Sequence, residues 1–324
     1  MAQYLEHLTN GFCRTPALYQ IPIASANRKR NGSREFVVAV RDALNADGSK
    51  RYPLDIKMNT HVTKVTFCNN GTTPRANGVE YLEGKGIYKA SKLFGRAGRG
   101  TPGSVHASRE VIVAGGSYNS PQILKLSGIG PADELRRFDI PVVKDAPGVG
   151  SNLQDHYEIS VQSTFANDFP SLDGCTFGFF GQPDPCLDDW RQSPRIGVTY
   201  DSSGFAASAF FKSSATPDGN YDVFAFGGPV NFRGYFPNYS VNATIEHNWW
   251  SWALLKGHPQ NAAGTITLRS ADPLDVPDIQ FNFFQNGADT DLQALYESIT
   301  FARGAFARQP IPFQEQQPGP QLQS

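Results

Sequence analysis

The sequence predicts a mixed α/β and α+β fold in two domains, and three observations support this. The chain has 324 residues, a length typical of about two domains. Residues 110–116 form an apolar run that ends in two glycines and is followed by a helix signal, which is typical of a buried parallel strand leading into a helix. From Tyr157 onward, short segments rich in Phe, Tyr, Trp, Gly and Pro indicate an antiparallel sheet. We therefore expect one domain over residues 1–156 and a second from residue 157.

Residues 1–34 contain Pro16, Pro22 and a polar basic run, so we expect mostly loop there. Apolar spacing over residues 36–44 predicts a short amphipathic helix. Alternating residues over 54–58, 62–67 and 76–82, with a turn signal at residues 69–71, predict a small β-meander. The basic, glycine-rich segment 85–103 lacks interleaved aromatic residues, which favours a solvated insertion over a nucleic-acid loop.

Two helices are expected after the apolar run. Ser120 is a good N-cap and Pro121 a good first residue, so the first helix should run from Pro121 and stop near Gly128. The second should start at Pro131, because acidic residues follow it and basic residues come one turn later, in agreement with the helix dipole.

The second domain is expected over residues 157–308. Strand character is found at residues 206–211, 221–226 and 264–269, and residues 292–306 have helical apolar spacing. The tail over residues 309–324 is rich in Gln and Pro, so we expect it to be poorly ordered.

Composition excludes several classes of function. A formal net charge of -1 gives no field that would attract nucleic acid or an anionic membrane. No apolar stretch reaches the length of a membrane-spanning helix, and the first 13 residues do not resemble a signal peptide, so the location of the complete protein, secretion included, stays open. Cys175 and Cys186 lie close enough in sequence for a disulfide, but two reduced structural cysteines fit equally well. No zinc-type spacing occurs, so no metal site is expected.

Two long motifs resemble those of the glucose-methanol-choline (GMC) oxidoreductases. Residues 115–131 read GGSYNSPQILKLSGIGP, which resembles the second signature of that family, and residues 148–156 read GVGSNLQDH, which resembles its V-G-x-N-L-x-D-H loop. Three shorter segments keep the family order: THVTKV at 60–65, NGVEY at 77–81 and GTITLRSADP at 264–273. The resemblance implies a partial FAD-binding, Rossmann-like domain plus a substrate-binding domain with an antiparallel sheet.

The resemblance also implies roles for individual residues. Val62 would hold the adenine edge of FAD through its main chain, and Ala114, Gly115 and Gly116 would let the backbone pass close to the ADP portion. Asn152 and Asp155 would lie in the loop between the domains, either at the cofactor or fixing that loop through backbone contacts. The reaction implied is hydride transfer from a small alcohol to the flavin.

Two family elements have no counterpart in the sequence. The G-x-G-x-x-G turn after a buried strand is missing, and none of the six histidines lies in a segment resembling the C-terminal catalytic motif. We therefore assign no catalytic residue and expect this chain alone to be an inactive fragment. Neither the alcohol nor the oligomeric state can be read from the sequence.

A second hypothesis belongs to another class of function. Trp249, Trp250 and Trp252 lie close together beside His247, and such a cluster could serve a non-enzymatic β-rich module as a stacking platform for sugars. A half-buried aromatic strand explains the same pattern, and we prefer that interpretation.

Overall fold

The computed structural model describes residues 17–19, 21, 23–69, 73–192 and 199–319. The chain divides into two compact units. Unit 1 comprises Met1–Ala39, His156–Gln260 and Gly287–Ser324, and unit 2 comprises Val40–Asp155 and Asn261–Asn286. The sequence suggested a single division near residue 156. In the structure the chain passes from one unit to the other four times.

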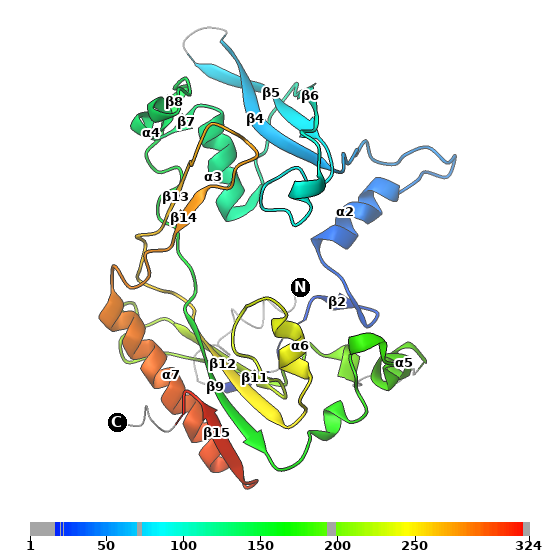
Figure 1. The fold of residues 1–324 in the computed structure, drawn as a ribbon, viewed down its shortest axis with the longest axis vertical. Helices are drawn as coiled ribbons and strands as arrows, with labels where there is room; N and C mark the ends of the chain where they lie inside the picture. Colours follow the sequence, from blue (N-terminus) through cyan, green and yellow to red (C-terminus); the bar gives the residue numbers. More distant parts are fainter. Residues whose placement is uncertain (1–16, 20, 22, 70–72, 193–198, 320–324) are drawn as a thin grey trace. The chain divides into compact units, whose positions relative to one another are not determined.

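Unit 1 is built on a six-stranded antiparallel sheet (Figure 1). The strands are ordered β1 (Ala17–Tyr19), β10 (Ala207–Phe211), β11 (Val223–Gly228), β12 (Trp249–Lys256), β9 (Glu158–Phe165) and β15 (Phe313–Gln317). The strands predicted at 206–211 and 221–226 are confirmed as β10 and β11. The three neighbouring tryptophans lie in β12, as expected for an aromatic strand.

Helix α7 (Ala288–Arg308) packs along one face of this sheet (Figure 1). Because side chains alternate along a strand, every second residue of the central strands faces the helix. Val161 of β9 lies opposite Trp252 of β12, and both join Ala302 and Phe306 of α7 in one buried core cluster. The helix predicted at 292–306 is therefore confirmed and is one turn longer at its start, where Gly287 has a φ of 66°.

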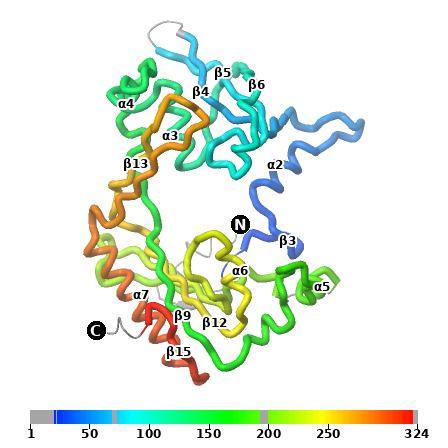
Figure 2. Tube along the Cα trace, in the orientation of Figure 1, coloured from blue at the N-terminus to red at the C-terminus, as the bar shows by residue number. Residues whose placement is uncertain are grey.

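The tail is the first correction to the predictions. Residues 313–317 form β15, which pairs with the edge of β9 although the two strands lie about 150 residues apart in sequence (Figure 2). Phe313 stacks on Phe306 with ring centroids 5.3 Å apart, and Glu315 pairs with Arg303 at 2.8 Å. Composition alone predicted poor order, but these tertiary contacts stabilise a strand.

Unit 1 also contains the short strands β2 (Ser25–Ala26) and β3 (Lys29–Arg30) and the helices α5 (Pro185–Gln192) and α6 (Tyr239–Thr244). Cys175 and Cys186 form a disulfide with their Cα atoms 5.1 Å apart, which decides between the two alternatives left open by the sequence. This disulfide closes the loop that precedes α5.

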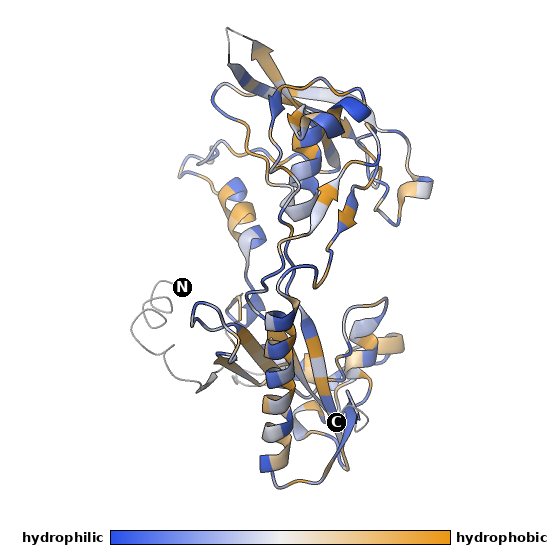
Figure 3. Cartoon of the chain, turned by 90° about the vertical axis from the view of Figure 1, so that its left-hand side faces the viewer, coloured by the Kyte–Doolittle hydropathy of each residue, from blue (hydrophilic) through white to orange (hydrophobic). Residues whose placement is uncertain are grey.

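Helix α2 (Ser33–Asp42) confirms the helix predicted at 36–44, shifted by a few residues toward the N-terminus. None of its residues is buried, and Phe36 is 71% exposed. Figure 3 shows the apolar run in the middle of this helix.

Unit 2 contains a three-stranded antiparallel sheet in the order β4 (Thr60–Asn69), β5 (Pro74–Glu83) and β6 (Thr101–His106). It also contains α3 (Gly116–Leu126), α4 (Ala132–Arg137), the parallel pair β7 (Ile129–Gly130) and β8 (Lys144–Asp145), and the antiparallel pair β13 (Thr265–Thr267) and β14 (Asp278–Gln280). The two predicted strands at 62–67 and 76–82 are confirmed. Residues 54–58 do not form a strand. The apolar residues of their alternating pattern are not buried, since Ile56 is 37% exposed and Met58 70% exposed.

The apolar run 110–116 is the second correction. Residues 110–114 form neither helix nor strand and pair with no strand in the described parts of the chain, and Ile112 is 78% exposed. A parallel strand is stabilised only beside hydrogen-bonded neighbours, so an apolar run without them cannot become part of a sheet. Helix α3 begins at Gly116 with Gly115 as its N-cap, so Pro121 lies inside the helix and Ser120 is not the cap.

Candidate functional site

The first strand of unit 2 has an open edge at Val62. On β5, the Asn77 carbonyl accepts a hydrogen bond from the Ala107 N–H, so alternate residues of β5, including Tyr81, direct their main chain toward β6. Val62 pairs with Tyr81. The N–H and C=O of Val62 must therefore point away from β5, toward the free edge of β4. Within the described residues, neither group has a hydrogen-bond partner there.

Helix α3 closes the same edge three residues further along. The main-chain N–H of Val65, which also points away from β5, donates to Ser127 Oγ at 2.8 Å. Ser127 Oγ in turn donates to the Ile123 carbonyl at 2.5 Å, at the end of α3. This contact fixes the C-terminal end of α3 against β4 and leaves the main chain of Val62 open beside it.

The opposite end of α3 carries the glycines of the motif. Gly116 has a φ of 84°, which favours glycine, and a Cβ added there would meet nothing within 4 Å. A Cβ on Gly115 would lie 3.2 Å from Asn119 Cβ and 3.3 Å from Ser120 N, in the first turn of α3. Ala114, Gly115 and Gly116 are all exposed. The backbone is thus bare at the start of the helix, about 16 Å along α3 from Ser127.

A buried ion pair holds the rest of the site framework. Lys125 Nζ lies 2.7 Å from Glu134 Oε2 and donates to the Ile266 carbonyl at 2.6 Å. Glu134 Oε1 accepts the N–H of Leu268 at 2.7 Å. The Lys125 and Glu134 side chains are only 1% and 6% exposed, so the pair joins α3, α4 and β13 without access to water. In the sequence Lys125 is a lone charge among the apolar residues of the segment 123–126, and this pattern is the only local sign of a buried charge there.

The loop that contains Asn152 and Asp155 is anchored to β13 by its backbone. The Gly150 carbonyl accepts the N–H of Ile266 at 2.7 Å, and Leu153 N–H donates to the Gly264 carbonyl at 2.9 Å. Asn152 has a left-handed φ of 56°, which asparagine tolerates better than most residues. Asn152 and Asp155 are both exposed.

All six residues predicted to bind the cofactor lie in unit 2: Val62, Ala114, Gly115, Gly116, Asn152 and Asp155. Their segments are joined through Ser127, Lys125 and Gly150. The arrangement suits a long ligand with a nucleotide at one end, since an open strand edge provides a donor and an acceptor and the bare backbone lies at a helix N-terminus. The donor set of the site therefore fits a dinucleotide.

The basic segment after β5 has a structural explanation. Lys89 Nζ pairs with Asp275 at 2.7 Å and with Asp272 at 3.0 Å, and hydrogen bonds to these two carboxylates raise the pKa of Lys89. The segment is therefore tied to the loop before β14, as expected for an insertion within the fold.

Other classes of site find no support in the described parts of the chain. Trp249 and Trp252 are 8% and 6% exposed, so the tryptophan cluster offers no open platform for sugars. Residues 17–19, 21, 23–69, 73–192 and 199–319 contain no group of three His, Cys, Asp or Glu side chains arranged to hold a metal ion. No helix within the same ranges is long and apolar enough to cross a bilayer.

Comparisons with known proteins agree with the motifs. A sequence profile described as GMC oxidoreductase matches residues 7–158. The oxygen-dependent choline dehydrogenase of Yersinia pseudotuberculosis serotype IB (strain PB1/+) is 33% identical over 258 residues, which cover 75% of this chain and 41% of that enzyme. The mitochondrial choline dehydrogenase of Mus musculus is 32% identical over 292 residues, or 84% of this chain and 40% of that enzyme. The chain thus spans about two fifths of the length of these relatives.

Solved structures share the fold. A formate oxidase from Aspergillus oryzae RIB40 has a TM-score of 0.62 at 21% sequence identity, covering 80% of this chain and 45% of the oxidase. Pyridoxine 4-oxidase from Mesorbium loti has a TM-score of 0.62 at 17% identity, covering 94% of this chain and 48% of that enzyme. The profile, the relatives and the shared fold agree: the chain belongs to the GMC oxidoreductase family.

Proposed function

We propose that the complete protein is an FAD-dependent oxidoreductase that oxidises the CH–OH group of a small alcohol, and that this chain supplies part of its FAD site and its substrate domain. Unit 2 carries the cofactor residues, and the antiparallel sheet of unit 1 forms the substrate domain. The observation that supports this most directly is the main chain of Val62, which is open at the edge of β4 beside α3.

The residues of this chain bind and orient the cofactor rather than react with substrate. The Val62 N–H and C=O would hold the edge of the adenine base, one as donor and the other as acceptor. Ala114, Gly115 and Gly116 let the ADP portion approach the start of α3, where the unpaired N–H groups of the first turn favour negative charge. Asn152 and Asp155 orient the loop anchored to β13. Bound flavin supplies the hydride acceptor.

The relatives indicate the class of substrate. Two of them are named choline dehydrogenases, and choline is a small primary alcohol. A small alcohol is also consistent with a chain whose net charge is close to zero. We assign no catalytic residue in this chain, because none of its histidines lies in a segment like the family's C-terminal motif.

The proposal is tested on the complete protein that contains this sequence. We expect it to retain FAD through purification, and we expect choline or another small alcohol to bleach the visible flavin absorbance under anaerobic conditions. Bleaching without oxygen isolates the hydride-transfer step from the choice of electron acceptor. Absence of bound flavin after reconstitution with FAD, or flavin that no alcohol in a broad panel reduces, would contradict the proposal.

A further inference from the structure

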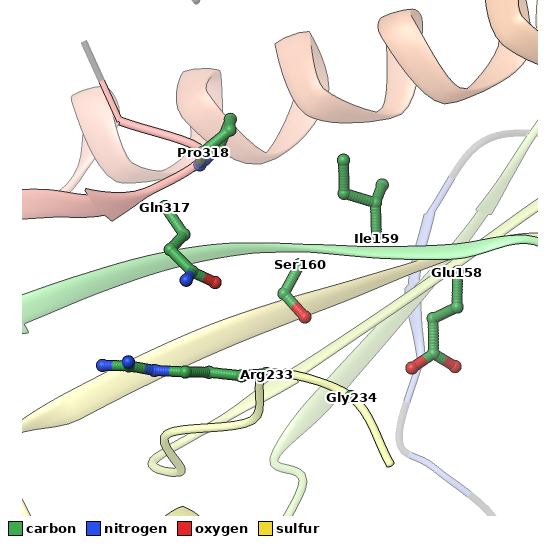
Figure 4. Close-up of a pocket in the computed structure, with 7 residues that line it drawn as sticks. All are labelled: Glu158, Ile159, Ser160, Arg233, Gly234, Gln317 and Pro318. Carbon is green, nitrogen blue, oxygen red and sulfur yellow. The ribbon is translucent and has the colours of Figure 1, made fainter. Parts of the chain in front are cut away.

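Unit 1 contains a pocket of about 350 Å³ on the sheet beside β9. It is lined by Glu158, Ile159 and Ser160 of β9, by Arg233 and Gly234 after β11, and by Gln317 and Pro318 at the end of β15 (Figure 4). Figure 4 shows the Ser160 hydroxyl and the Gln317 amide on the side of the Arg233 side chain, with the Glu158 carboxylate at the far end. The volume is at the lower end of the range for small-molecule sites.

The guanidinium of Arg233 is held in place from two sides. Its Nε donates to Asn231 Oδ1 at 3.0 Å, and its Cζ lies 5.0 Å from the ring centroid of Trp249, which is only 8% exposed. The face of an indole attracts a cation above it, which helps to hold the guanidinium in place. Arg233 forms no ion pair with any described residue, so its terminal nitrogens are available to a ligand.

Buried hydrogen bonds fix the segment that carries Arg233. Gln162, which is 0% exposed, donates from Nε2 to the Phe232 carbonyl at 2.8 Å and to Asn231 Oδ1 at 3.3 Å. Ser251 Oγ, also fully buried, accepts the Phe232 N–H at 3.0 Å and donates to the Val230 carbonyl at 2.6 Å. The segment from Val230 to Phe232 is thus tied to β9 and β12, which preorganises the cation that follows it.

The free polar groups of the pocket define its ligand. Like the terminal nitrogens of Arg233, the Ser160 hydroxyl and the Gln317 amide make no hydrogen bond to described residues. A guanidinium with two free terminal nitrogens matches a carboxylate in a bidentate geometry. Glu158 at the far end disfavours a second negative charge on the ligand. A small monocarboxylate meets both conditions.

We propose that this pocket binds a small monocarboxylate, with its carboxylate on Arg233. The site lies within unit 1 and needs no flavin, so the inference stands independently of the proposed function. Its failure and the failure of FAD binding are therefore separate outcomes.

The test uses glycolate as the probe and glycolamide, its neutral counterpart, as the comparison. Saturation-transfer NMR on the full chain should show binding of glycolate and at least roughly tenfold weaker binding of glycolamide, because the charge-assisted pair is lost. Arg233→Gln should weaken glycolate binding by a similar factor. Arg191→Gln, which removes an exposed cation of unit 1 that pairs with Asp188 outside the pocket, should leave it unchanged.

Further comparisons keep the test decisive. Arg233→Lys retains the charge but loses the planar fork, so binding should be intermediate. If Arg233→Gln fails to fold, the ratio of glycolate to glycolamide binding in the wild-type chain decides alone. Equal binding of these two probes, glycolate binding that Arg233→Gln leaves intact, or stronger binding of inorganic phosphate than of glycolate would overturn the proposal.

Discussion

Replacing Lys256 with methionine is expected to lower the unfolding free energy of unit 1 by about 3–5 kcal/mol, the range for removing one partner of a buried ion pair. Lys256 Nζ lies 2.7 Å from Asp222 and 3.9 Å from Asp291, and all three side chains are at most 3% exposed. Asp291 also accepts the N–H of Gln260. Methionine fills similar space but leaves buried carboxylate charge uncompensated.

Tryptophan fluorescence measures this effect in unit 1 alone. All four tryptophans, Trp190, Trp249, Trp250 and Trp252, belong to that unit, so urea unfolding followed by their emission does not report unit 2. Lys29→Met, an exposed lysine of the same unit, should change stability by about 0.5 kcal/mol or less. Adding Asp222→Asn to Lys256→Met should recover part of the loss. A urea midpoint of Lys256→Met equal to that of Lys29→Met would contradict a stabilising role for the buried ion pair.

The same pair predicts a direction for the pH dependence. Burial by itself raises the pKa of Asp222, but hydrogen bonds from Lys256 and Ser213 outweigh it and hold the pKa below the ordinary value of 3.8. A carboxyl with a lowered folded-state pKa stabilises fully above its ordinary pKa. That contribution is lost as the pH falls through the lower, folded-state value.

Replacing Lys125 with methionine is expected to have a comparable effect, about 3–5 kcal/mol, on unit 2. The substitution leaves Glu134 charged and buried and deprives the Ile266 carbonyl of its donor. Lys125 also packs against Gly150, since its Cε and Nζ lie within 3.0 Å of where a Cβ on Gly150 would be. The loop 148–153 should therefore loosen together with β13. Hydrogen exchange should therefore accelerate in peptides covering α3, α4 and residues 264–269.

Two matched variants separate charge from packing at this site. Lys144→Met removes an exposed lysine of the same unit and should leave exchange unchanged. Lys125→Met combined with Glu134→Gln removes the buried charge while keeping an acceptor for the Leu268 N–H, and should restore part of the protection. Wild-type exchange rates in Lys125→Met would show that the ion pair does not hold these elements together.

Sequence patterns predicted those elements whose partners are close in the chain or whose signal is long. Strands β10 and β11 form a hairpin-like pair, and α7 has sustained apolar spacing, so local pattern and tertiary environment agree. The prediction of a buried parallel strand at residues 110–116 was wrong, because an apolar composition does not tell whether a neighbouring strand is present. The prediction of a poorly ordered tail was wrong for the opposite reason. The polar composition of β15 gives no sign of its distant partner, β9.

The family motifs point to the candidate site, and the contacts that arrange its residues are visible only in the structure. Periodicity cannot tell that Val62 lies at an edge with its main chain turned outward, because this depends on the pairing of β5 with β6. The roles of Ser127 and Lys125 depend on contacts made across the fold. The local sequence gives the residue types of the site, and strand pairing determines where their main-chain groups point.

FAD binding by two variants of Val62 tests the central claim most directly. Proline at this position removes an N–H that points away from β5, so the sheet should remain intact, whereas alanine keeps the main chain and removes only the side chain. In the complete protein we expect Val62→Pro to weaken FAD binding by roughly tenfold, the loss of one hydrogen bond with its partner left unpaired. We expect Val62→Ala to bind FAD like the wild type. Equal FAD affinity in the two variants, with circular dichroism confirming folded protein, would contradict a cofactor role for this strand edge.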